Sequence, residues 1–223
     1  MPENAVRAAA GLNTPRAAAI AGIVFSALLI AIVWLLRRVV PADPLDSGGW
    51  IATEMETVTL ALNLVPFAGV AFLWFIGVLR DRLGAQEDRF FATVFLGSAL
   101  LFLAMLFAGA AIAGAIMLMA SSAEFTDLTK LPVFRFARAS VYIIVNAYAM
   151  KMACVFMIST STVVIRTGIA PRWIAILGFV LACILLIGSY YHGWSIAVLP
   201  IWVLLLSIYI LIHNLGRQEE RSR

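Results

Sequence analysis

The chain has 223 residues, of which 63% are hydrophobic and only 13% are charged, and its formal net charge is +4. A soluble domain is about half apolar and about a quarter charged, so this composition excludes an ordinary soluble protein. Nucleic-acid binding is not expected either, because the basic residues form no stripe interleaved with aromatic side chains. The sequence therefore predicts an integral membrane protein surrounded by lipids.

Six apolar segments of roughly 20 residues or more follow one another, and each is long enough to cross a hydrocarbon core of about 30 Å. We predict helices, because a helix satisfies its own backbone hydrogen bonds in lipid and the segments lack the alternation of barrel strands. The fold class is thus all-α, with residues 1–223 forming one membrane domain. The expected helices are about 16–37, 53–79, 90–119, 138–165, 172–190 and 194–213.

The distribution of basic residues predicts the orientation. With the amino terminus inside, the inner side carries ten arginines, whereas the outer side carries only Arg37, Arg38, Lys130, Arg135 and Arg138. Basic residues concentrate in cytoplasmic loops, so we expect both termini inside.

The second expected helix carries two polar residues of interest, Glu56 and Asn63. Thr53 and Glu56 fit a capping box, in which the threonine caps the helix and the glutamate reaches back to its amide. Glu56 and Asn63 are seven residues apart and therefore share a helix face. A proline three residues later, Pro66, leaves the carbonyl of Leu62 without its helical donor.

An alanine stripe marks the third expected helix, at Ala104, Ala108, Ala111 and Ala115. Small side chains let helix backbones approach closely, either within a bundle or between subunits. Packing inside the bundle is the expected role, with a subunit contact as the alternative.

The fourth expected helix places Lys151 about 20 Å from the nearest basic residue on either side, Arg138 and Arg166. A charged ammonium at mid-bilayer costs at least about 2.5 kcal/mol, so the lysine should face protein or water and have a partner. All twelve carboxylates lie in loops or near helix ends, and the polar groups at comparable depth are Asn63 and Asn146.

Three interpretations of Lys151 stay open. Asn63, Asn146 and the Leu62 carbonyl could hold it as a neutral amine. It could stay charged and meet an anionic ligand or the carboxylate of a partner subunit, or it could titrate in a proton-coupled cycle. A polar track from Glu56 past Asn63 and Asn146 to Lys151 is geometrically possible.

Two helical hairpins look alike. PRAAAIAGIVFSALLI begins at Pro15 and PRWIAILGFVLACILL begins at Pro171, and both place a glycine seven residues after the proline, at Gly22 and Gly178. Duplication is one explanation, since internal repeats are common in transporters. Chance similarity between apolar helices is the other.

The IAG near the start of the first expected helix and the stretch RTGIAPRWIAILG, residues 166–178, resemble a family of six-helix bacterial membrane proteins catalogued as a domain of unknown function. The overall style is similar to that of actinobacterial members. The resemblance implies the fold and a bacterial inner (cytoplasmic) membrane location, and it implies no activity.

No nucleophile, base and orienting group are spaced as a catalytic set, and we expect no cofactor and no metal site. The first functional hypothesis is a non-enzymatic accessory or scaffold subunit that binds a partner membrane protein or forms a homo-oligomer. The alternative is a small permease or channel-like protein for an anionic or proton-coupled solute, using Lys151, Asn63, Asn146 and Glu56. A lipid-modifying enzyme is the third.

Overall fold

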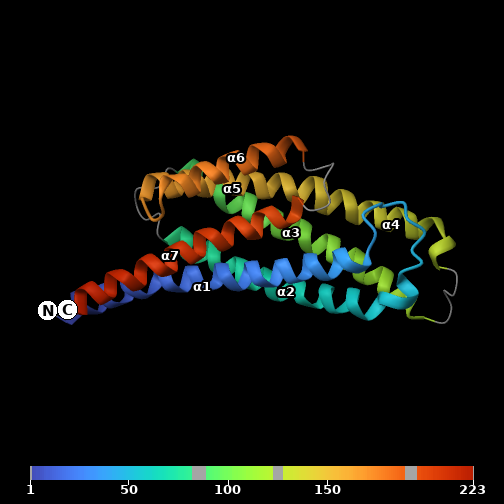
Figure 1. Ribbon diagram of the computed structural model, residues 1–223, viewed down its shortest axis with the longest axis horizontal. Coiled ribbons are helices and arrows are strands. Elements are labelled where there is room, and N and C mark those ends of the chain that lie inside the picture. The colour runs from blue at the N-terminus through green and yellow to red at the C-terminus, as the bar shows by residue number, and fades with distance from the viewer. Residues whose placement is uncertain (1, 82–88, 123–127, 189–194, 223) are drawn as a thin grey trace.

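The computed structural model describes the chain except residues 1, 82–88, 123–127, 189–194 and 223, and the described part contains helices joined by turns and loops (Figure 1). The long helices are α1 (Pro2–Val39), α2 (Ile51–Asp81), α3 (Arg89–Ala120), α4 (Pro132–Ile143), α5 (Met150–Thr167), α6 (Arg172–Gly188) and α7 (Val198–Ser222). Shorter elements are the 3-10 turns η3 (Leu128–Lys130) and η5 (Ser195–Ala197) and the π-helical segment η4 (Ile144–Ala149).

The elements α4, η4 and α5 follow one another without a break and form one rod, Pro132–Thr167. The described elements therefore make six rods, and the all-α fold class is confirmed. Five rods are long and apolar enough to cross a membrane, namely Ala17–Val39, Ile51–Arg80, Ala92–Ala120, Pro132–Thr167 and Ser195–His213. The sixth, α6, is apolar but has only 17 residues.

Four predicted helix starts differ from the structure by two residues or more. That of α7 is Val198, after the 3-10 turn η5, whereas a helix was expected from residue 194. α1 begins at Pro2 and the rod α4–α5 at Pro132, whereas the apolar pattern placed them near residues 16 and 138. α2 begins at Ile51, so Thr53 lies inside its first turn. There the Thr53 hydroxyl donates to the Trp50 carbonyl at 3.3 Å. The predicted capping box between Thr53 and Glu56 is therefore wrong.

The bundle is elongated, and α7 ends beside the start of α1 (Figure 1). α1 packs against α2 and α7, α3 packs between α2 and the rod α4–α5, and α6 lies along α5. The opposite end, which we call the loop end, carries the connection Pro41–Trp50. α6 and α7 stop short of it, so α1, α2, α3 and α4 extend beyond them (Figure 1).

Aromatic rings fill the middle of the bundle. Phe72 of α2 is fully buried, and its ring lies 4.5 Å from Phe25, 5.5 Å from Phe102 and 5.2 Å from Phe156, measured between centroids. A further contact joins Phe156 to Phe95 at 5.3 Å. We call these five side chains the phenylalanine cluster, and it connects α1, α2, α3 and α5.

The two similar hairpins pack differently. α1 lies along α2 over much of its length, whereas α6 packs mainly on α5 and meets α7 only locally. That local contact is close, because a Cβ at Gly178 would strike Ser161 and the Trp202 ring, and the Trp202 Nε1 donates to the Ile174 carbonyl at 3.1 Å. The equivalent glycine, Gly22, also supports close packing, since a Cβ there would strike Ser207 and Phe75.

The alanine stripe of α3 faces outward. Ala104, Ala111 and Ala115 are exposed, and Ala108 is half-buried. Packing within the bundle was the expected role of this stripe, and that expectation is wrong for the three exposed alanines, because the core-facing side of α3 carries Phe95, Phe102 and other large residues.

Candidate functional site

Lys151 lies in the first turn of α5, midway along the rod Pro132–Thr167, and its side chain is exposed. Its neighbours Met150, Ala153 and Cys154 are buried, so the lysine occupies the face of the rod that is turned away from the core. Among the described residues it makes no hydrogen bond or ion pair. Tyr148, one turn earlier on the same face, is also exposed.

The other predicted members of the polar track do not join Lys151. Asn63 and Glu56 are both exposed on α2. Asn146 alone is buried, with 8% of its surface exposed. Because α3 packs between α2 and the rod that carries Lys151, the structure does not assemble the four residues into one track.

Asn146 is placed by the π-helical segment η4. Its Nδ2 donates to the carbonyl of Tyr142 at 3.1 Å, and its side chain lines a partly open cavity. The Val145 side chain of η4 lies close to α3 at Gly109, where an added Cβ would come within 2.6 Å of it. A π-helical turn inside an α-helix frequently accompanies a functional site, because it redirects side chains locally.

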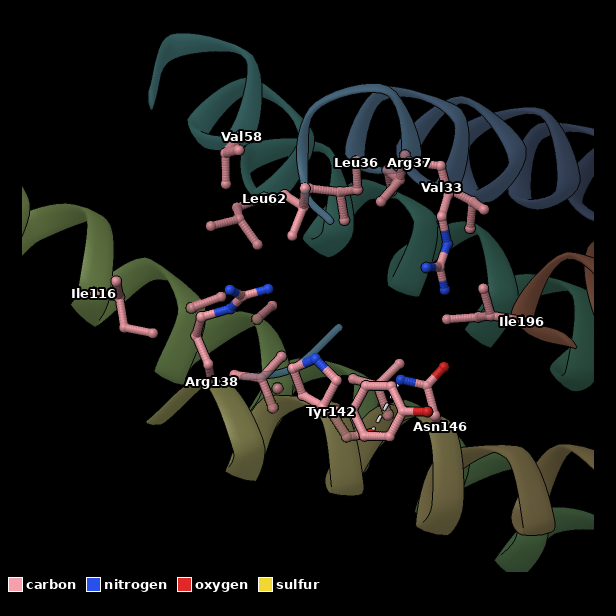
Figure 2. Close-up of a pocket in the computed structure, with 18 of the residues that line it drawn as sticks. Val33, Leu36, Arg37, Val58, Leu62, Ile116, Arg138, Tyr142, Asn146 and Ile196 are labelled. Atoms are coloured by element: carbon pink, nitrogen blue, oxygen red, sulfur yellow. Dashed lines mark hydrogen bonds between the residues drawn. The ribbon is translucent and has the colours of Figure 1, made fainter. Parts of the chain in front are cut away.

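The cavity has a volume of about 210 Å³ and lies at the loop end, between α1, α2, α3 and the rod α4–η4. Small residues of α3 leave this space open, chiefly Gly109, Ala110 and Ala113. Other walls are aliphatic, with Val33, Leu36, Val58, Leu62, Ile116 and Ile196 among them (Figure 2).

The loop Pro41–Trp50 lies over the cavity and is held by Arg138 of α4. Arg138 is buried, and its guanidinium donates to the carbonyls of Pro41, Asp43 and Asp46 at 3.0–3.3 Å. It also forms an ion pair with the Asp46 carboxylate at 3.3 Å. The same carboxylate accepts the Gly48 amide at 2.9 Å, so one arginine and one aspartate fasten most of the loop.

Gly48 allows the loop to close on α4. Its φ of 80° lies in the left-handed region that favours glycine, and a Cβ would strike the ring of Phe134. Trp50, at the end of the loop, lies beside Arg138. The guanidinium carbon is 5.6 Å from the centroid of the Trp50 ring. The buried Trp50 Nε1 has no hydrogen-bond partner among the described residues.

Arg37 of α1 approaches from the opposite side. It is half-buried, it lines the cavity, and its guanidinium extends between α1 and the rod toward Tyr142 and Asn146 (Figure 2). Tyr142, on the rod α4–η4, lines the same cavity (Figure 2). The next residue, Arg38, points away and lies 4.5 Å over the Trp34 ring on the exposed surface.

Reasoning from the sequence missed Arg37, Arg138 and Tyr142 as site residues. Both arginines lie near the ends of apolar segments, where a basic residue ordinarily marks topology, so they were counted as surface charges. The only available signal was the pairing of basic helix ends with the acidic connection Pro41–Trp50.

Comparison with known proteins yields no relative: no family model matches the sequence, and no curated protein or solved structure matches it.

Proposed function

We propose that this protein is a non-enzymatic accessory subunit of a larger membrane assembly, and that Lys151 pairs with an intramembrane carboxylate of a different chain. The observation that carries the proposal is the exposure of Lys151 midway along a rod of 36 residues. Lys151 lies about 20 Å or more from the basic residues toward either end, which is beyond the reach of its side chain.

In this proposal the chain crosses the membrane six times, and both termini lie in the cytoplasm. α7 ends beside the start of α1 (Figure 1), and an even number of crossings brings both ends to one side. α6 has 17 residues and is therefore about 26 Å long, which is at the short end of the range for a membrane-spanning helix. The loop end then faces outward, as expected from the distribution of basic residues.

Within the membrane, an exposed lysine contacts lipid unless another molecule covers it. A lysine at the centre of a span costs at least about 2.5 kcal/mol, and a carboxylate in a neighbouring helix removes most of that cost. A second, parallel copy of this chain supplies no such group, because its carboxylates lie in loops and near helix ends. The charge therefore calls for a partner with an aspartate or glutamate inside one of its own spans.

The exposed alanines of α3 support the same function. A surface of small residues on a membrane helix favours close approach by another helix. Ala104, Ala111 and Ala115 provide such a surface outside the bundle.

The test is purification of the native chain in a mild detergent, followed by native mass spectrometry, beside Lys151→Met and Lys151→Arg. We expect a stoichiometric companion with the native chain and with Lys151→Arg, and its loss with Lys151→Met while that variant stays folded. A native chain that purifies alone, or a companion retained equally by all three, would contradict the proposal. Sequencing the companion then tests for an intramembrane Asp or Glu.

A further inference from the structure

Asn146 brings an unsatisfied amide to the loop-end cavity. One hydrogen of its Nδ2 goes to the Tyr142 carbonyl at 3.1 Å, and its other hydrogen and its oxygen have no partner among the described residues. The side chain lines the cavity and has only 8% of its surface exposed (Figure 2). A buried acceptor without a donor is costly, so the amide oxygen calls for a donor from outside the chain.

The space beside this amide suits hydrocarbon. Its volume is about 210 Å³. Apolar cavities of about 150 Å³ in proteins already accommodate a benzene-sized molecule. The walls contributed by Val33, Leu62 and Ala113 carry no hydrogen-bonding side chain. Water fills such a space poorly, because a buried water needs about two to four polar partners. A molecule with an apolar body and one polar group is therefore the better occupant.

The lining also decides the charge of that polar group. Its charged members in the described part of the chain are Arg37 and Arg138, and none is an Asp or Glu, so a cation is disfavoured. An anionic oxygen has no hydrogen to give to the Asn146 oxygen. Both arginines already interact within the protein, Arg138 with the loop and Asp46. An uncharged donor remains, and a hydroxyl is the simplest.

We propose that this cavity binds a small uncharged alcohol, whose hydroxyl donates to the Asn146 Oδ1 and whose apolar body lies among Val33, Leu62 and Ala113. The body has about six to eight carbon atoms, judged from the space that benzene needs. The π-helical segment η4 supports the assignment, because such a turn redirects a side chain and frequently accompanies a functional site. Lys151 is not among the lining residues, so this site is separate from the proposed partner contact.

The first experiment compares four probes that share a six-membered ring: cyclohexanol, methylcyclohexane, cyclohexylammonium and cyclohexanecarboxylate. Each is titrated calorimetrically into the native full-length protein in a neutral detergent, with empty micelles as the blank. We expect saturable one-to-one binding of cyclohexanol and no binding of the two ions. Methylcyclohexane should bind at least about tenfold more weakly, because it has no hydrogen for the Asn146 oxygen.

Asn146→Leu tests the polar contact, because leucine has a similar size and no hydrogen-bonding group. Its affinity for cyclohexanol should fall to that for methylcyclohexane, whereas its affinity for methylcyclohexane should stay unchanged. Comparing two ligands on two chains separates the hydrogen bond from a change in packing. Asn63→Leu, on the exposed surface of α2, is the matched control and should change neither affinity.

A second pair of variants locates the apolar body. Ala113→Leu adds atoms to the cavity and should weaken the binding of cyclohexanol by at least about tenfold. Ala111→Leu, on the exposed face of α3, should have no effect.

Three outcomes would overturn the inference. They are equal affinities of the native chain for cyclohexanol and methylcyclohexane, a preference for cyclohexanol that persists in Asn146→Leu, and heats no larger than those of empty micelles, which would leave water on the amide. If Asn146→Leu does not fold, the four probes on the native chain and the pair Ala113→Leu and Ala111→Leu still decide the matter.

Discussion

Around Phe72 the helices α1, α2, α3 and α5 meet through aromatic rings. About two turns nearer the loop end, α1, α2, α3 and the segment α4–η4 surround a cavity of about 210 Å³. The difference arises largely on α3. Its half near Arg89 supplies Phe95 and Phe102 to the core, and its other half supplies Gly109, Ala110 and Ala113. The long side chains in one half of α3 fill the core around Phe72, and the short side chains in the other half leave the cavity.

A second cause is the length of the neighbouring rods. α7 packs on α1 in the close-packed half, but it begins at Val198. Among the described residues from 195 onward, only Ile196 reaches the cavity. The loop Pro41–Trp50 and Arg138 then close the space that no rod fills. Stability should therefore depend on the packing of aromatic rings around Phe72, and on the hydrogen bonds and ion pair of Arg138 at the loop end.

The largest expected effect is at the hub of the phenylalanine cluster. Phe72→Ala removes a fully buried ring that contacts three others and should lower the free energy of unfolding by about 3–5 kcal/mol. Leu62→Ala, at the cavity wall, should cost clearly less, because its neighbours are incompletely packed already. Unfolding in mixed micelles measures both. Equal losses of unfolding free energy in the two variants would contradict the difference in packing between the phenylalanine cluster and the cavity.

Arg138→Gln should cost about 2–3 kcal/mol, because it breaks the ion pair with Asp46 and leaves three carbonyls of the loop with weaker donors. Hydrogen exchange should rise in residues 43–50 and stay unchanged around Phe72. Arg135→Gln, on the exposed side of the same helix, is the control. Loop exchange that does not change would show that Arg138 does not fasten it.

A smaller effect is expected where α6 joins the bundle. Gly178→Ala places a methyl group against Ser161 and the Trp202 ring and should destabilise the protein by about 1–3 kcal/mol. Gly77→Ala is the matched control, because a Cβ there has no neighbour within 4 Å, and it should be neutral or slightly stabilising. The thermal midpoints of the two variants give the comparison. A neutral Gly178→Ala would contradict close packing of α6.

The smallest effect should be a gain. Ala113→Leu adds aliphatic atoms to the cavity and should stabilise the chain by about 0.5–2 kcal/mol. Ala111→Leu on the exposed face should change little. A loss of stability in Ala113→Leu would mean that the loop end has no room for the added atoms.

Much of the fold could be predicted because apolar length and turn residues are local signals. Pro66 lies inside α2, as the sequence indicated, and the rod that carries Lys151 ends at Thr167, two residues from the expected end of the helix 138–165. The faces of the helices could not be predicted. Lipid and core are both apolar, so a membrane helix lacks the periodic pattern that shows which side of it carries Lys151 or Ala104.

The candidate site was only partly predictable for a related reason. Asn146 was identified as a polar residue inside a span, and it lines the cavity. Arg37 and Arg138 were not identified. Their place at the cavity depends on the loop Pro41–Trp50, which closes over the bundle and lies about 90 residues before Arg138 in the sequence. Such a contact leaves no local pattern in the sequence.

The most direct measurement is a crystal structure of the protein under xenon pressure, since xenon enters apolar cavities and is excluded from close-packed cores. We predict density for xenon, or for a retained hydrocarbon chain, between Val33, Leu62 and Ala113, and none among Phe25, Phe72 and Phe156. An empty and collapsed loop end, or equal xenon binding at both levels, would contradict the account.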